Sequence, residues 1–378
     1  TPTFFAFEKI YFDSPESGHI YPPEVIKAEG NAQDWKKLVG TGPFMMSNWV
    51  AGSHITYTKN PDYWKDDEKF PGNRLPYVDT LKLMFIKERA TLISALRTGK
   101  IPYMRGLSED EYKGLKRSVP DLVVQNAFQF RSTSSYGMDV MNPPFDDVRV
   151  RRAMQLALDL DTFNKALYGG LGDMTPRGIF GGDTIGFHVP YEEWPEEVKQ
   201  SYVYDPERAE KLLDEAGYPR GSDGVRFKTK NYQRISPSND LDFLQAAKDY
   251  WAKIGVDVEI VIQETPVFIA NINARTWEGM IWGEYAANSD PLGYVRTHGH
   301  SKGNWNFSKV AFPEIDALVE KAESASTFEE MQRLVTKWDM TAIEDHWGVY
   351  GGVAPAWHAW MPWLGGYNGE DTLGGGQD

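Results

Sequence analysis

The chain has 378 residues, a length at which a single hydrophobic core usually gives way to two. Its 54 acidic and 40 basic residues give a formal net charge of −14, which argues against nucleic acid or an anionic membrane surface as the main partner. The sequence contains no cysteine, which excludes disulfides, thiolate catalysis and cysteine-ligated zinc.

The first part of the chain predicts strands and one short helix. A Gly-Pro turn in residues 39–44 (VGTGPF) leads into a strand, and residues 60–64 (NPDYW) form an acidic, aromatic loop. Alternating apolar residues over 81–85 predict a second strand. An apolar stripe over 92–96 predicts a helix that Gly99 ends.

Capping residues mark the first helices of the middle part. Asp146 or Asp147 is positioned to cap a helix whose apolar stripe runs over 150–158. We expect Asp161 to restart the helix and Gly169 to end it.

The next elements are punctuated just as clearly. Asp205 is a good N-cap, the proline that follows it suits the first helical position, and Gly217 fits the left-handed C-cap. A helical stripe over 243–254 passes through a glycine into alternating apolar residues at 256–262, which predict a strand.

The last third continues the alternation of strands and helices. Residues 280–282 predict an apolar strand, and 315–322 predict a helix. Thr327 and Glu330 form a capping box before another helix, and 349–351 predict a strand. This order of elements indicates an α/β protein.

Several of these segments occur in an order and at intervals that resemble one known family. They are residues 39–44, 60–64, 75–79, 145–152, 204–217, 251–258 and 289–291. Together they resemble the extracellular solute-binding proteins of family 5, the peptide-, nickel- and oligosaccharide-binding receptors of ABC importers. The resemblance covers nearly the whole chain.

The resemblance implies a periplasmic-binding-protein type II fold, with two lobes of mixed sheets flanked by helices and a hinge between them. We expect residues 1–130 and 349–378 to form lobe one and residues 131–348 to form lobe two. Relatives carry a further N-terminal part before the segment that aligns with the start of this chain. Lobe one is therefore expected to be incomplete in this sequence.

Two charged residues are the sharpest candidates for ligand contacts. In dipeptide-binding relatives, an arginine at the position of Arg234 grips the ligand carboxylate, and an aspartate at the position of Asp290 holds the ammonium. Planar bidentate geometry suits a guanidinium to a carboxylate. Capping of a turn ahead of Pro291 is the alternative role for Asp290.

Aromatic residues supply the other candidates. Core packing accounts for most of the 13 tryptophans, but six are predicted in loops or at strand ends, where they could stack on sugars or cover apolar side chains: Trp282, Trp305, Trp347, Trp357, Trp360 and Trp363. The ligand contacts expected from the sequence are Arg234, Asp290, Trp282, Glu284, Tyr285, Trp305, Trp347 and Trp357.

Other candidate sites have weak support. His298 and His300 could offer two imidazoles to a metal, but solvated loop histidines are the favoured interpretation. The carboxylate pairs at 66–67 and 196–197 lie in polar stretches and are expected to be surface charge rather than a glycosidase pair. No nucleophile elbow, P-loop or dinucleotide fingerprint occurs. We expect no catalytic residue, metal or cofactor.

The function implied is a monomeric receptor that delivers a small ligand to the permease subunits of an ABC importer. A short peptide is the expected ligand, and an oligosaccharide bound by the same fold is the alternative. A secreted carbohydrate-active hydrolase is the alternative from another class. The resemblance places the protein in the periplasm or outside the cell, with any export signal or lipid anchor outside this sequence.

Overall fold

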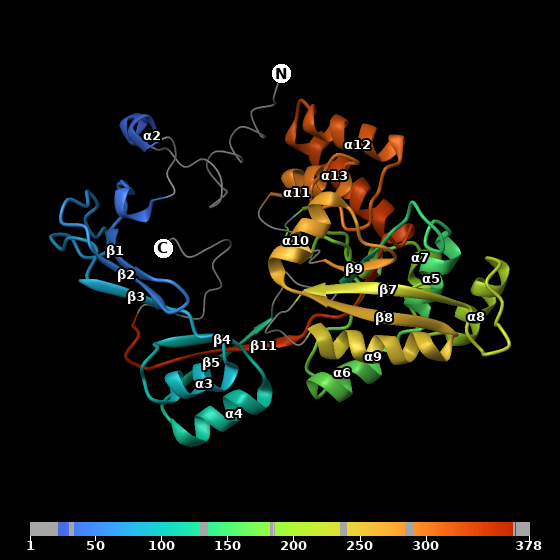
Figure 1. Ribbon diagram of the computed structural model, residues 1–378, viewed down its shortest axis with the longest axis horizontal. Helices are drawn as coiled ribbons and strands as arrows, with labels where there is room; N and C mark the ends of the chain where they lie inside the picture. Colours follow the sequence, from blue (N-terminus) through green and yellow to red (C-terminus); the bar gives the residue numbers. More distant parts are fainter. Residues whose placement is uncertain are drawn as a thin grey trace. The chain divides into compact units, whose positions relative to one another are not determined.

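The computed structural model describes residues 22–29, 34–128, 135–181, 184, 186–234, 240–283, 290–365 and 367. The chain divides into two compact units, and the division falls between Ile101 and Pro102 (Figure 1). Lobes are defined by motion about a hinge rather than by compactness. The lobe boundaries expected at 130 and 349 therefore stay a prediction.

The unit that ends at Ile101 is built on a three-stranded antiparallel sheet in the order β1-β2-β3. Its elements are α2 (Pro23–Glu29), the 3-10 helix η2 (Trp35–Lys37), β1 (Phe44–Val50), β2 (His54–Lys59), β3 (Thr80–Met84) and α3 (Arg89–Arg97). The strands β1 and β3 and the helix α3 lie where the sequence predicts them. No residue of these three strands is fully buried.

The loop after β2 is fixed by side chains from the two motifs that the sequence analysis singled out. The Asn60 amide donates to the Gly42 carbonyl at 2.9 Å, and its oxygen accepts from the Asp62 backbone at 3.0 Å. Further along, the Tyr77 hydroxyl donates to the Asp67 carboxylate at 2.5 Å, which lowers the pKa of Asp67. The Asn60–Gly42 bond ties the loop to the Gly-Pro turn that begins β1, and the other two bonds fix the loop internally.

The second unit contains a small sheet in the order β4-β11-β5. The strands are β4 (Tyr103–Leu107), β5 (Val123–Phe128) and β11 (Pro355–Trp360), and α4 (Glu109–Ser118) follows β4. Both neighbours of β11 run antiparallel to it. A segment late in the chain therefore pairs with two strands that precede it by more than 200 residues.

A five-stranded mixed sheet in the order β10-β6-β9-β7-β8 forms the centre of the second unit. The strands are β6 (Ser135–Met138), β7 (Phe227–Arg234), β8 (Val256–Gln263), β9 (Met280–Trp282) and β10 (Gly348–Tyr350). Strand β7 is parallel to β8 and β9, whereas β6 is antiparallel to β9 and β10. The carboxyl ends of β7, β8, β9 and β10 therefore meet at one edge, where β6 begins.

Helices fill the rest of the second unit. They are α5 (Val148–Leu156), α6 (Leu160–Tyr168), η3 (Tyr191–Glu193), α7 (Glu196–Lys199), α8 (Pro206–Glu215), α9 (Asp240–Lys253), α10 (Thr265–Ala274), α11 (Pro291–Gly299), α12 (Pro313–Glu323) and α13 (Phe328–Glu344). In the described part of the chain, no helix is both long and apolar enough to cross a membrane.

Most helix boundaries agree with the caps expected from the sequence. The side chains of Asp147, Asp205 and Thr327 each accept a backbone N–H as N-caps. The prediction that Asp161 begins the second helix is wrong: Asp159 is the cap, and its carboxylate accepts from the Thr162 backbone at 3.0 Å. Asp161 lies within the first turn of α6, one residue after the helix begins, and therefore does not occupy the N-cap position.

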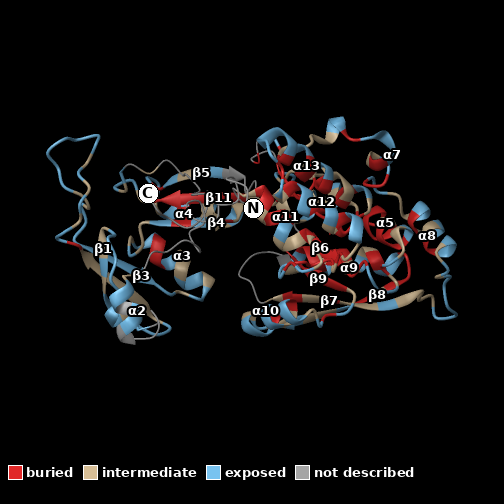
Figure 2. Cartoon of the chain, turned by 90° about the horizontal axis from the view of Figure 1, so that it is seen from above, coloured by how far each residue is buried: buried red, intermediate tan, exposed pale blue. Residues whose placement is uncertain are grey.

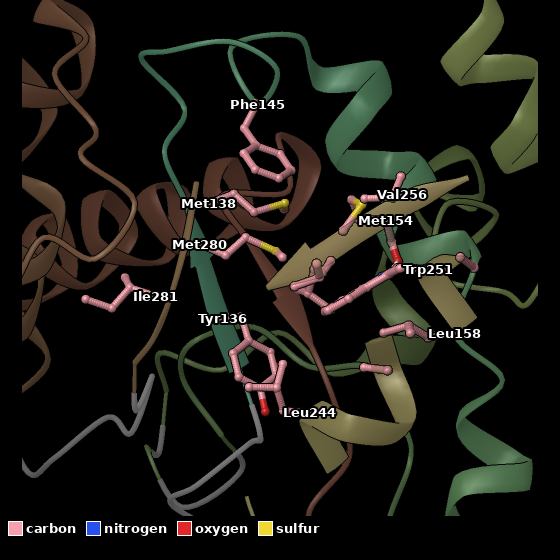
Figure 3. Close-up of a cluster of buried hydrophobic side chains, with 14 of the residues drawn as sticks. Tyr136, Met138, Phe145, Met154, Leu158, Leu244, Trp251, Val256, Met280 and Ile281 are labelled. Carbon is pink, nitrogen blue, oxygen red and sulfur yellow. Dashed lines mark hydrogen bonds between the residues drawn. The ribbon is translucent and has the colours of Figure 1, made fainter. Parts of the chain in front are cut away.

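The core of the five-stranded sheet contains methionine and aromatic side chains. Met138 and Met280 are register partners on the adjacent strands β6 and β9. Their side chains point toward Met154 of α5 and Trp251 of α9 (Figure 3). The Trp251 indole donates to the Met154 carbonyl at 2.9 Å, which joins α9 to α5. A second apolar cluster, which includes Trp338, is formed largely by α11, α12 and α13.

Candidate functional site

Arg234 is the last residue of β7 and lies at the edge where the carboxyl ends of the parallel strands meet. Its guanidinium carbon lies 4.4 Å from the ring centroid of Trp282, the last residue of β9. The parallel register pairs Tyr232 with Ile281, so the ends of β7 and β9 lie side by side and Trp282 is within reach of the Arg234 side chain. In open α/β sheets ligands bind outside such an edge.

Trp282 is itself held in place. It is 5% exposed, and the ring of Phe268 from α10 lies 6.2 Å from its ring in a tilted arrangement. On the other side of β9, Tyr136 of β6 pairs with Trp282 in the antiparallel register. The indole therefore forms a fixed surface under the guanidinium.

A second aromatic group lies beside the end of β9. Gly283 leaves no room for a side chain, because a Cβ there would lie 2.7 Å from the ring of Phe307. The ring of Trp305 lies 5.8 Å from that of Phe307 and is 37% exposed. Trp305 is thus a half-exposed aromatic surface near the same edge as Arg234.

The loop that carries Trp305 is braced by buried polar contacts. The Asn306 side chain is 1% exposed, donates to the carbonyls of His300 and Val310, and accepts from the Val310 backbone at 2.9 Å. Arg275 donates to the Gly303 carbonyl at 2.7 Å. A braced aromatic residue loses little entropy when a ligand stacks on it.

Asp290 caps helix α11. Its carboxylate accepts from the Gly293 backbone at 2.9 Å, and Pro291 occupies the first helical turn. This is the capping role that the sequence offered as the alternative to binding an ammonium. A role in ligand binding for Asp290 stays a prediction.

Two predicted contacts lie in apolar surroundings instead of at this edge. Trp347 is 2% exposed and its ring lies 5.5 Å from that of Trp338. Trp357 lies on β11, is 6% exposed and packs at 5.0 Å against Tyr112 of α4. That Trp347 and Trp357 contact the ligand stays a prediction, and their burial does not favour it. Glu284 and Tyr285 lie outside the described residues.

The interpretation of the two histidines as solvated loop residues is wrong. His298 lies in α11, and its ring stacks on Tyr294 with 3.7 Å between centroids. Burial lowers the pKa of His298 to about 3, so it is neutral at physiological pH. His300 is the C-cap of the same helix. Among the described residues, no group of three or more histidines and carboxylates could hold a metal.

A hollow of about 650 Å³ lies at the opposite edge of the sheet, where β7 and β8 begin. Each of its three lysines has a carboxylate partner: Lys228 with Asp257 at 3.2 Å, Lys230 with Glu278 at 3.7 Å and Lys309 with Asp139 at 2.9 Å. A ligand would have to compete with these pairs, and the predicted site residues lie elsewhere.

The sequence did not single out Phe268 or Phe307, the two rings that support Trp282 and Trp305. Neither ring belongs to a motif or apolar stripe that the sequence analysis marked. Phe268 lies in α10, the element just before β9, and Phe307 lies two residues after Trp305, so the sequence lacks a signal for the packing of these rings rather than for their proximity.

Comparison with known proteins places the chain in a family. The family model described as bacterial extracellular solute-binding proteins, family 5 Middle, matches residues 2–306. The periplasmic oligopeptide-binding protein OppA of Escherichia coli is 28% identical over 89% of this chain and 59% of its own length. Heme-binding protein A of Haemophilus influenzae is 29% identical over 83% of this chain and 54% of its own length.

A solved structure extends the comparison to the fold. The oligopeptide-binding protein AppA of Bacillus subtilis, in complex with a nonapeptide, superimposes with a TM-score of 0.73 at 20% identity, over 92% of this chain and 68% of that one. The architecture is that of type II periplasmic binding proteins, as expected. The chain spans little more than half the length of the curated relatives. It belongs to the bacterial extracellular solute-binding proteins of family 5.

Proposed function

We propose that this chain is the ligand-binding part of a receptor that delivers a short peptide to an ABC-type importer. The observation that carries the proposal is Arg234, which lies on Trp282 at the carboxyl edge of the sheet in a chain of this family. A guanidinium at such an edge suits the carboxylate at the end of a peptide. The OppA and AppA relatives are named as peptide-binding proteins.

The residues have different roles in this proposal. Arg234 binds the ligand carboxylate, and Trp305 offers its half-exposed ring to an apolar or aromatic side chain. Asp290, if it reaches the ammonium, does so while capping α11. No bond is made or broken; the cleft shape and a few polar anchors give selectivity.

The proposed partners and location follow from the family. The receptor acts as a monomer in the periplasm or outside the cell, and it releases its ligand to permease subunits in the membrane. Relatives with different names, one for oligopeptides and one for heme, show that the fold serves more than one ligand class.

An oligosaccharide is the second candidate ligand, and Trp305 is the observation that favours it. A ring that is 37% exposed on a braced loop can stack on the apolar face of a sugar. A hydrolase has less support: the Asp67 carboxylate is engaged by Tyr77, and Glu196 and Glu197 lie in the first turn of α7. Hydrolysis of chromogenic glycosides, lost when a carboxylate is replaced, would favour the hydrolase.

The decisive experiment identifies the ligand and then removes its anchor. Mass spectrometry of small molecules released from the purified protein should find short peptides. Calorimetry should then show that Arg234→Ala weakens binding of the identified peptide by at least tenfold, since loss of a desolvated charged anchor costs about 2–5 kcal/mol. Arg234→Lys keeps the positive charge but not the planar guanidinium, so its affinity for the peptide should lie between those of the wild type and Arg234→Ala. A change within about twofold for Arg234→Ala would refute the peptide proposal.

A further inference from the structure

We propose that Trp282 is a positioning residue, whose indole holds the Arg234 guanidinium in the orientation in which it binds the ligand carboxylate. The inference rests on the proposed function and adds a residue that acts through Arg234. It gives Trp282 a different role from the direct ligand contact expected from the sequence.

The geometry separates the two roles. Trp282 is 5% exposed, so little of its surface is left for a ligand, whereas the Arg234 guanidinium carbon lies 4.4 Å above its ring. A guanidinium at this distance is attracted to the ring, because the negative face of the indole draws the delocalised charge. Most of the ring's function at this edge must therefore pass through the arginine.

The ring is fixed by its own neighbours. Phe268 from α10 lies 6.2 Å from it, and β9 is paired on one side with β6 and on the other with β7. Trp282 thus belongs to the packed part of the sheet, while Arg234 is the last residue of β7. A rigid ring under a long, flexible side chain restricts its rotamers before the ligand arrives.

Restriction of rotamers matters because an unrestrained arginine loses side-chain freedom when it binds. A guanidinium already held against the indole loses less, and its affinity for a carboxylate is correspondingly higher. Loss of the indole should therefore weaken recognition of the carboxylate selectively. It should leave contacts with the remainder of the ligand unchanged.

The test compares trialanine with trialanine amide, which lacks only the terminal charge. Calorimetry measures both affinities for the wild type, Trp282→Leu and Trp282→Phe, with circular dichroism to check folding. Trp305→Leu is the matched control: it removes a tryptophan near the same edge that is proposed to face the ligand side chains, so it should change affinity for the acid and the amide by the same factor. We expect Trp282→Leu to reduce affinity for trialanine about tenfold and to leave affinity for the amide unchanged.

Further variants keep the test decisive. Trp282→Phe retains a ring and should lose less affinity for trialanine than Trp282→Leu. If the leucine variant does not fold, the phenylalanine variant provides the comparison. In an Arg234→Ala background, Trp282→Leu should cause no further loss, because the two residues act as one unit. Equal loss for both ligands, or an undiminished preference for the acid, would overturn the positioning role while the proposed function stands. A wild type that binds neither ligand would refute the peptide proposal, and the positioning role with it.

Discussion

The three-stranded sheet of the first unit and the five-stranded sheet of the second differ sharply in burial. Every residue of β6, β9 and β10 is buried, whereas every residue of β3 is exposed. The buried strands β6 and β9 are red in Figure 2. Both sheets nevertheless contain alternating apolar residues. An apolar alternation thus identifies the face that a strand would bury, but other elements decide whether that face is covered.

The exposed face of the first sheet is a continuous apolar row. The register places Ile55 opposite Leu83, Tyr57 opposite Leu81 and Trp49 opposite Ile55. Leu81, Leu83 and Trp49 remain 40%, 44% and 47% exposed. Such a row is unusual on a monomer, and it means that this sheet gains less from burial than the five-stranded sheet does.

Core substitutions should give the largest difference between the two sheets. Trp251→Ala removes a fully buried indole and its bond to Met154, and it should cost about 3–5 kcal/mol of unfolding free energy. Trp49→Ala is the matched variant in the first unit and should cost less than about 1 kcal/mol. Chemical denaturation of both variants measures the difference. Equal losses would show that Trp49 is covered in solution.

The pH dependence of stability should also belong to the second unit. Asp339 on α13 is buried and accepts from the Ile179 backbone at 2.8 Å, and burial raises its pKa to about 7 from an ordinary 3.8. The folded state therefore holds the proton more tightly. The contribution of the protonated Asp339 to folding stability is complete below pH 3.8 and is lost as pH rises toward 7.

Asp339→Asn isolates this contribution. The substitution removes the titrating group. The unfolding free energy of the wild type, measured relative to that of the variant, should therefore fall by about 4 kcal/mol between pH 4 and pH 8. Urea unfolding across this range measures it. In the described part of the first unit no ionisable side chain is buried, so its unfolding should show no comparable loss. A wild type and variant with parallel pH profiles would contradict the prediction.

Hydrogen exchange should resolve the comparison along the backbone. Amides of residues 154–158 and of β8 should be strongly protected, because they lie in the packed sheet and its helices. Amides of β1 should exchange faster, because that strand is partly exposed along its length. Equal protection in both sheets would mean that the first unit is as stable as the second.

The sequence predicted the elements that carry local signals. Caps at Asp147 and Asp205 and the passage from α9 into β8 depend on neighbouring residues, and all three are confirmed. Strand β11 carried no such signal, because it lies between β4 and β5 and is buried on both faces, so its apolar residues do not alternate. Its partners are distant in the sequence, and no local pattern specifies them.

The candidate site shows the same limit. Resemblance to a family marked Arg234, and an apolar run marked Trp282, but their contact follows from the parallel pairing of β7 with β9. Phe268 supports the pair from a third element. Residue type and spacing can predict each side chain separately. The stacking depends on a register that pairs Tyr232 with Ile281, 49 residues later in the chain, and no sequence spacing reveals it.

Helix capping should give the smallest effect and should separate the two roles of Asp290. Asp290→Ala removes the bond to the Gly293 backbone and should cost about 1 kcal/mol. Asp34→Ala, at the short helix η2 of the first unit, removes a similar bond from an exposed three-residue element and should cost only a few tenths. Thermal and urea unfolding of both variants measure the difference.

Asp290→Asn then distinguishes the cap from a ligand contact. Asparagine caps a helix about as well as aspartate, so stability should be unchanged, while the negative charge is lost. If Asp290 only caps α11, peptide affinity should also be unchanged, since the bond at 2.9 Å to Gly293 needs an oxygen and not a charge. If it also holds an ammonium, affinity should fall at least tenfold at unchanged stability, because a neutral amide replaces one partner of a charged pair. The two outcomes differ in a single measurement on a folded variant, which the alanine substitution cannot provide.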